Sequence, residues 1–237
     1  MEFISNIIFL LLTVIAFYIF AKKILRIKRN IQLGRPVELN DQPIARWKNV
    51  FLLALGQKKM FQNIPVALLH LILYVGFVII NTELLEIIID GIAGTHRFFA
   101  PFLGGLYPFL INSFEVLALL VFVACIFFLS RRNIIYVKRL VSKDLTGWPK
   151  TDANLILVIE MVLMGLFLTM NAADPAANFI ISGWIKPSLS NLDAHQLHTI
   201  EQSAWWMHIL GIYGFMNYLP YSKHLHIVLA FPNAYYA

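Results

Sequence analysis

Histidine is the residue type in this sequence best suited to chemistry, and the chain has seven: His70, His96, His195, His198, His208, His224 and His226. His70 and His208 lie within long apolar stretches. A titratable group inside a membrane helix is costly and is by default a functional hypothesis. A neutral imidazole with a free ring nitrogen suits a haem iron, and helix bundles build cofactor sites from facing helices. For any one such histidine, a hydrogen bond to a neighbouring helix is an equally good interpretation.

The spacing of the last histidines indicates which of them share a helix face. His208 and His226 are 18 residues apart, which is about five turns of a regular α-helix and about 27 Å along its axis. His224 is 16 residues from His208, or about 160° around the helix. Regular geometry therefore favours His226 over His224 as the companion of His208. Pro220 lies between them and can kink or break the helix.

Five apolar segments must position these histidines. The chain is 59% hydrophobic and 14% charged, whereas a soluble domain carries about 25% charged residues. Crossing a bilayer takes about 20 apolar residues, and a spanning backbone must satisfy its own hydrogen bonds. The sequence therefore predicts an all-α membrane protein, a five-transmembrane-helix bundle that forms a single domain over residues 1–237. The predicted helices cover about 3–21, 64–89, 109–129, 153–170 and 203–221.

The basic residues predict the orientation of this bundle. Of the 19 lysines and arginines, all but Arg97 and Lys186 fall in loops on one side of the predicted membrane. By the positive-inside rule that side is cytoplasmic, so the N-terminus is outside and the C-terminus cytoplasmic. The net charge of +6 then reflects topology, and nucleic acid is not expected as a partner. The expected location is the bacterial inner (cytoplasmic) membrane, where His70 would meet His226 or His224 near the inner face.

Two regions carry motifs that resemble a known family. The last predicted helix contains Trp-Met-His at 206–208, Leu-Pro-Tyr-Ser-Lys-His-Leu-His-Ile at 219–227 and Phe-Pro at 231–232. The second contains Gly-Gln-Lys-Lys-Met at 56–60, Leu-His-Leu at 69–71 and Gly-Phe at 76–77. These motifs resemble the last and second helices of the respiratory nitrate reductase gamma-subunit family. That family includes the membrane cytochrome b subunits of heterodisulfide reductases and of related sulfur-metabolism complexes.

The resemblance implies a set of iron ligands. The family pattern has two histidines eighteen apart on the last helix, which His208 and His226 match, and two that are ten apart on the second helix. His70 matches the inner member of that second pair, so His70 and His226 would hold an inner haem b. The outer member falls at Ile80, which cannot ligate iron. His208 would then be an outer-haem ligand without its standard partner. The number of haems, one or two, is therefore left open.

The missing partner of His208 could come from an outside loop. His96, His195 and His198 are the candidates, and His96 is favoured because it follows the second helix almost directly. A loop histidine beside Arg97 is more often simply solvated or hydrogen-bonded.

The family's function implies the partners of this chain. In the family, the quinol form of menaquinone or another quinone is oxidised in the membrane. The electrons leave inward to an iron–sulfur protein. Cys125 is the single cysteine, whereas iron–sulfur clusters need several. The iron–sulfur partner would therefore be another subunit, or a domain that continues after residue 237. The lipid bilayer is the remaining expected partner.

Several charged residues have a second interpretation as functional groups. Glu83, Glu86 and Glu115 could form a proton exit near the outer surface, although interface depth alone would also explain them. Glu160 lies deeper, in the fourth helix. Lysines 58 and 59 could bind haem propionates, with lipid phosphate as the more common role. A haem-free small membrane transporter and a membrane anchor subunit remain the alternative functions.

Overall fold

The computed structural model describes residues 2–35, 41–57, 61, 63–135, 137 and 146–236, and side chains from residue 4 onward. Regular structure within these ranges is entirely helical. The all-α prediction is therefore confirmed. Lysines 58 and 59, for which the sequence predicts a phosphate- or propionate-binding role, lie outside the described residues.

Within the described residues, four helices are long and apolar enough to cross a membrane: α1 (Glu2–Ile31), α3 (Ile64–Ala93), α5 (Leu106–Asn133) and α6 (Trp148–Ala173). They coincide with the first four predicted segments. Each extends beyond its predicted end because polar residues join the last turns, as Lys28 and Arg29 do in α1 and Arg131 and Arg132 do in α5. Cations at a helix C-terminus complement the helix dipole. The chain has the helices of a multi-pass membrane protein.

The fifth predicted segment, 203–221, is helical but has different bounds. Helix α8 (Ala194–Tyr218) begins nine residues earlier, at a capping box in which Asp193 and Gln196 satisfy each other's backbone amides. His195 and His198 therefore lie on a helix rather than in an outside loop. Helix α8 is not among the candidate spans of the described chain.

Helix α8 ends at Tyr218, two residues before Pro220. A 3-10 turn (Leu219–Tyr221) and a second one (Lys223–Leu225) precede the short helix α9 (His226–Tyr235). A regular helix from His208 to His226 does not form. The prediction that His226 shares a face with His208 five turns away was wrong, because proline removes a backbone donor and its ring crowds the preceding turn.

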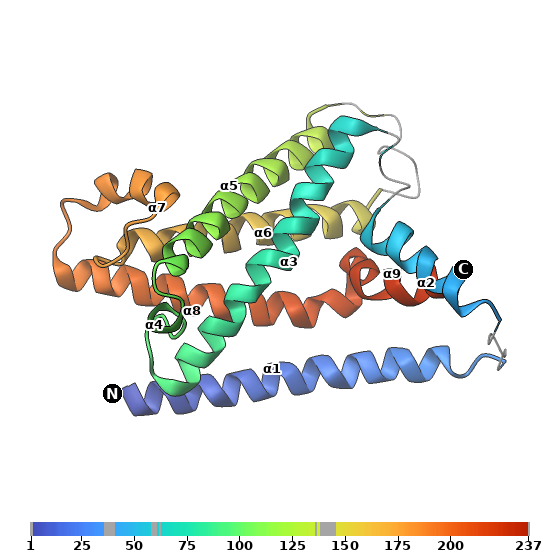
Figure 1. Ribbon diagram of the computed structural model, residues 1–237, viewed down its shortest axis with the longest axis horizontal. Helices are drawn as coiled ribbons and strands as arrows, with labels where there is room; N and C mark the ends of the chain where they lie inside the picture. Colours follow the sequence, from blue (N-terminus) through green and yellow to red (C-terminus); the bar gives the residue numbers. More distant parts are fainter. Residues whose placement is uncertain are drawn as a thin grey trace.

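The five long helices form a closed ring in which α1 packs on α3, α3 on α5, α5 on α6, α6 on α8, and α8 on α1 again. Figure 1 shows α1 and α8 running side by side along the molecule, with α3 and α5 inclined to both of them. The largest buried cluster lies where α3, α5 and α6 meet, around Ile111, Phe114 and Phe167. A smaller one joins α1 to α8 through Phe9, Ile209 and Tyr213.

The two ends of the ring carry different short helices. At one end, α2 (Pro43–Asn49), a π-helix (Val50–Leu55) and α9 pack together, and both views show them at the same end of the molecule as the last part of α1. The opposite end holds the start of α1, α4 (Ala100–Leu103), α7 (Ile180–Ile185) and a 3-10 turn (Lys186–Leu189). These are called the α9 end and the α7 end below.

Candidate functional site

Three histidines converge on one pocket at the α9 end, called the α9 pocket. His70 comes from the second turn of α3, His224 from the 3-10 turn after α8, and His226 from the first residue of α9. The pocket is a cavity of about 160 Å³ that is partly open to the outside. Most of its wall is apolar, as the lining by Leu73, Phe77, Ile80, Val121, Ile156 and Met164 shows.

The hydrogen bond of His226 fixes its ring. Its Nδ1 lies 2.8 Å from the backbone carbonyl of Lys223, and a carbonyl only accepts, so Nδ1 carries the proton. The Nε2 atom then has the free lone pair that a metal ion needs. His70 is half-buried, and its Nδ1 is buried without a hydrogen-bond partner within the described ranges. An unpaired buried polar atom is costly and calls for an explanation.

His224 is held by aromatic packing. Its ring centroid lies 6.2 Å from that of Phe77, 5.2 Å from that of Phe215 and 5.7 Å from that of His226. Its backbone amide donates to Ser222 Oγ at 3.1 Å. His224 is thus fixed beside His226 by neighbours on α3 and α8.

A second pocket adjoins the first in the middle of the ring and contains His208. The two pockets share several lining residues, among them Phe77, Ile80 and Glu160. His208 is 3% exposed, and its Nδ1 donates to the carbonyl of Leu163 at 3.0 Å, which leaves Nε2 as the acceptor. Glu83 also lines this pocket, on the side away from α9. Within the described chain, His208 is the sole histidine of this pocket.

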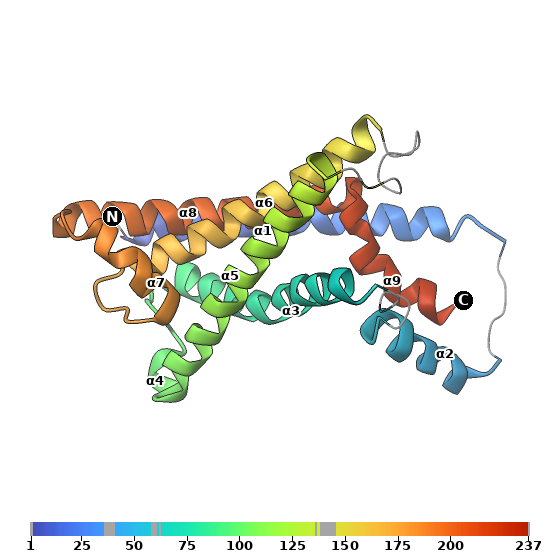
Figure 2. The ribbon, with the colours of Figure 1, turned by 90° about the horizontal axis from the view of Figure 1, so that it is seen from above.

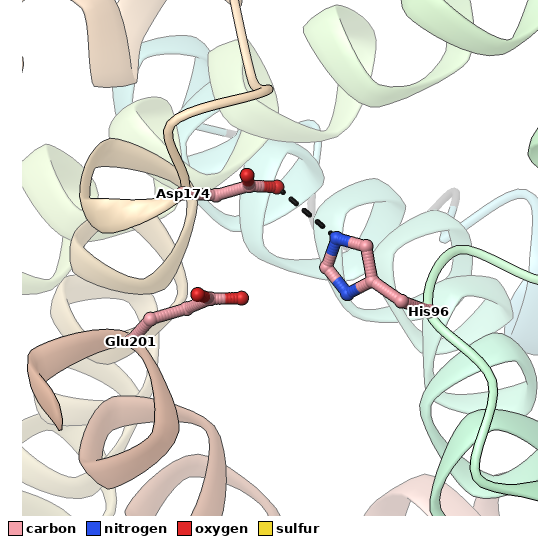
Figure 3. A group of neighbouring side chains, drawn as sticks. All are labelled: His96, Asp174 and Glu201. Atoms are coloured by element: carbon pink, nitrogen blue, oxygen red, sulfur yellow. Dashed lines mark hydrogen bonds and ion pairs between the residues drawn. The ribbon is translucent and has the colours of Figure 1, made fainter. Parts of the chain in front are cut away.

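A third pocket, the α7 pocket, lies at the opposite end and is lined mainly by polar groups. Asp174, just after α6, receives hydrogen bonds from Arg97 Nη2 at 2.7 Å and Arg97 Nε at 3.1 Å, and lies 3.3 Å from His96 Nε2. Glu201 on α8 faces the same space (Figure 3). Asp174 raises the pKa of His96 by hydrogen bonding. Burial alone would raise the pKa of Asp174, but the hydrogen bonds from His96 and Arg97 outweigh it and hold that pKa below its usual range.

Two of the carboxylates predicted near one surface have structural partners. Glu86 accepts hydrogen bonds from the Tyr107 hydroxyl and the Phe99 amide, both at 2.9 Å. Glu115, which is fully buried, accepts from Asn171 Nδ2 at 3.0 Å and from the amides of residues 181 and 182. These contacts attach α4 and α7 to the ring. Glu83 differs, because its Oε2 is buried without a partner in the described part of the chain.

The structure separates the predicted histidines into groups. It brings His70, His224 and His226 together, places His208 in the adjoining pocket, and puts His96 and His198 in the α7 pocket. His96, the favoured partner of His208 in the sequence, thus lines a different pocket from it. His195 lines none of the three.

Sequence reasoning missed Asp152, at the start of α6. It is 2% exposed, and its Oδ2 accepts a 2.9 Å hydrogen bond from the Lys223 amide, while Oδ1 is bonded to the Tyr218 hydroxyl. It therefore holds the turn that carries His224. A carboxylate at the edge of an apolar segment was the available signal.

Comparison with known proteins yields one informative relative. Neither a family model nor a solved structure matches the chain. A probable iron-sulfur-binding oxidoreductase, FadF of Bacillus subtilis (strain 168), is 26% identical over 244 residues, which cover 98% of this chain and 32% of that protein. The chain therefore spans about a third of its relative.

Proposed function

We propose that this chain is a haem b membrane subunit that transfers electrons between the quinone pool and an iron–sulfur partner. The observation that carries the proposal is the convergence of His70 and His226 on the α9 pocket. Bis-histidine ligation needs two imidazoles from different helices that face one cavity. His70 from α3 and His226 from α9 meet that requirement.

The residues of the α9 pocket fit a haem. His226 has its proton on Nδ1 and its lone pair on Nε2, and its bond to the Lys223 carbonyl is the outer support that metal-bound histidines usually have. The unpaired buried nitrogen of His70 indicates that this ring is placed for something other than packing. The apolar wall suits a porphyrin face. A bound haem b would supply a one-electron redox couple at this position.

Within this proposal the chain orients the ligands. Phe77 and Phe215 hold His224 beside the pocket, and the turn after α8 brings His226 into it. The α9 end has basic residues on the last turns of α1 and α5, which favours the cytoplasmic side. We place an iron–sulfur partner on that side; the existence of such a partner is supported by the name of the FadF relative, an iron-sulfur-binding oxidoreductase. Helix α8 is then the fifth span, with the N-terminus outside.

Quinol oxidation requires a proton acceptor and an exit. We place the quinone (menaquinone or another) near the pocket of His208, and the proton exit through Glu83 towards the α7 pocket. Glu83 supports this because it lines both pockets and has an unpaired oxygen. His208 is the ligand that a second haem would use.

A visible spectrum of the purified chain, produced in haem-replete cells, tests the proposal. We expect a b-type signal in the reduced-minus-oxidised difference that appears on adding menaquinol. A folded, colourless protein would overturn it and favour the transporter or anchor alternatives. His208→Ala then counts the haems: loss of half the pigment means two, and unchanged pigment means one.

A further inference from the structure

The mouth of the α7 pocket brings together three side chains that suit a metal ion. His96 lies in the loop after α3, Asp174 follows α6, and Glu201 is in the second turn of α8. One ligand atom from each lies within 4.8 Å of the other two. Figure 3 shows the three side chains pointing toward one another from three separate segments.

These residue types match the preferences of zinc. Zinc takes histidine nitrogen and carboxylate oxygen at about 2.0–2.2 Å, most often with four tetrahedral ligands. Tetrahedral ligands at that distance lie about 3.4 Å apart, so the three groups need to approach by little more than 1 Å. The His96 side chain is 62% exposed and that of Glu201 13%, so His96 has room to move. His198 lies next to Glu201, with Nδ1 3.8 Å from Oε2, and is available as a fourth ligand.

The number of carboxyl oxygen atoms in the pocket also favours a cation. Its lining includes five carboxylic side chains, from Glu83, Glu86, Asp90, Asp174 and Glu201, and one strongly basic side chain, Arg97. Glu83 gives an independent indication, because it is 7% exposed and its Oε2 has no hydrogen-bond partner within the described ranges.

Arg97 is the strongest argument against a metal, since its guanidinium already binds Asp174 Oδ2. This contact does not use all the lone pairs of the Asp174 carboxylate. A carboxylate oxygen has two lone pairs, and Asp174 Oδ1 bonds a single backbone amide, that of Ala176, at 2.9 Å. Arg97 therefore lowers the affinity of the site without occupying Glu201 or the His96 ring.

We propose that His96, Asp174 and Glu201 form a Zn²⁺ site at the mouth of the α7 pocket. Bound zinc links the loop after α3 and the end of α6 to the start of α8 at the rim. It is a separate site from the α9 pocket, and it does not depend on the electron-transfer function.

Equilibrium dialysis of the purified full chain against ZnCl₂, with excess MgCl₂ in both compartments, tests this site. We expect one zinc per chain at the α7 pocket, with at least tenfold weaker binding in His96→Ala and in Glu201→Gln. Two variants serve as matched controls. His195→Ala removes an exposed histidine from the first turn of α8, the turn before that of Glu201, and His226→Ala removes a histidine that could bind zinc in the α9 pocket. Both should retain the zinc that Glu201→Gln loses.

Thermal unfolding gives a second readout that is independent of electron transfer. A ligand that binds only the folded state stabilises it by mass action. Zinc should therefore raise the unfolding temperature of the original chain and of His195→Ala, and leave that of Glu201→Gln unchanged. Equal zinc binding and equal thermal shifts in all variants would overturn the proposal, as would a chain that binds no zinc in the presence of magnesium.

Discussion

The Asp152 carboxylate accepts a hydrogen bond from the backbone amide of Lys223, with 2.9 Å between Oδ2 and the nitrogen. The two residues are 71 positions apart, and the contact joins the start of α6 to the turn between α8 and α9. This turn places His224 and His226 in the α9 pocket. Asp152 lines none of the three pockets, but it positions His224 and His226, which line the α9 pocket.

Asp152→Ala should loosen this turn and weaken the binding of haem. The change removes the acceptor of the Lys223 amide and of the Tyr218 hydroxyl, and hydrogen bonds to a charged group are worth about 1.5–3 kcal/mol. We expect a lower haem content and a lower unfolding temperature. Asp152→Asn, which keeps one acceptor oxygen, should show a smaller loss. Full haem content in Asp152→Ala would show that the turn holds its shape without the carboxylate.

His224 and His226 should respond differently to substitution. His226 has a fixed proton on Nδ1, whereas His224 is held by rings on two sides. We expect His226→Phe to abolish the haem of the α9 pocket and His224→Phe to retain most of it, because phenylalanine keeps the aromatic packing. Pyridine haemochrome content of the two purified variants provides the measurement. The opposite result would make His224 the ligand.

These contacts show where sequence reasoning succeeded and where it stopped. The four spans could be predicted because a bilayer demands about 20 apolar residues in a row, and Pro220 was visible as a break. The meeting of His70 with His224 and His226 followed from the order of the helices. The pairing of His96 with Asp174 spans 78 positions and depends on how α3 and α6 end, which periodicity does not encode. The early start of α8 was missed because its first turns are polar.

Glu83→Gln should slow quinol oxidation and leave the haem content unchanged. The substitution keeps the size of a 7% exposed side chain but removes a group that can carry a proton between the two pockets it lines. General acid–base groups contribute about 10²–10⁴-fold to rate, so we expect a loss of about 10²-fold in menaquinol-dependent haem reduction. Thr82→Ala, at an exposed neighbour, should reduce at the original rate. An unchanged rate in Glu83→Gln would place the exit elsewhere.

Asp174→Asn should destabilise the metal-free chain in a pH-dependent way. The pKa of Asp174 lies below its usual 3.8, so its contribution is present above that pH and is lost as the pH falls through the lowered pKa. The pKa of His96 is raised above 6.5, so its contribution is complete below 6.5 and is lost as the pH rises through the raised pKa. The stability difference between the original chain and Asp174→Asn should therefore be largest between pH 3.8 and pH 6.5, the ordinary pKa values of the two groups. Unfolding in detergent with EDTA, followed by circular dichroism across pH, measures it. A difference that does not vary with pH would exclude the His96 contact as a contributor.

Gly91→Ala should destabilise the contact between α1 and α3. A Cβ at this position would lie 2.5 Å from the ring of Phe9. That ring is 1% exposed and packs on Trp205, Trp206 and Tyr213. It therefore has little freedom to move, and overpacking of this kind costs about 1–3 kcal/mol.

Gly165→Ala on α6 is the matched control for that change. Apart from the backbone of its own helix, no atom of the described residues lies within 4 Å of a Cβ added at Gly165, and alanine in a helix interior is favoured over glycine by about 0.5–1 kcal/mol. Thermal unfolding should thus move in opposite directions for the two variants. If Gly91→Ala also raised the unfolding temperature, α1 would have to pack against α3 more loosely than its buried phenylalanine indicates. The ring of five helices would then depend less on α1 than on the contacts of α8 with α6.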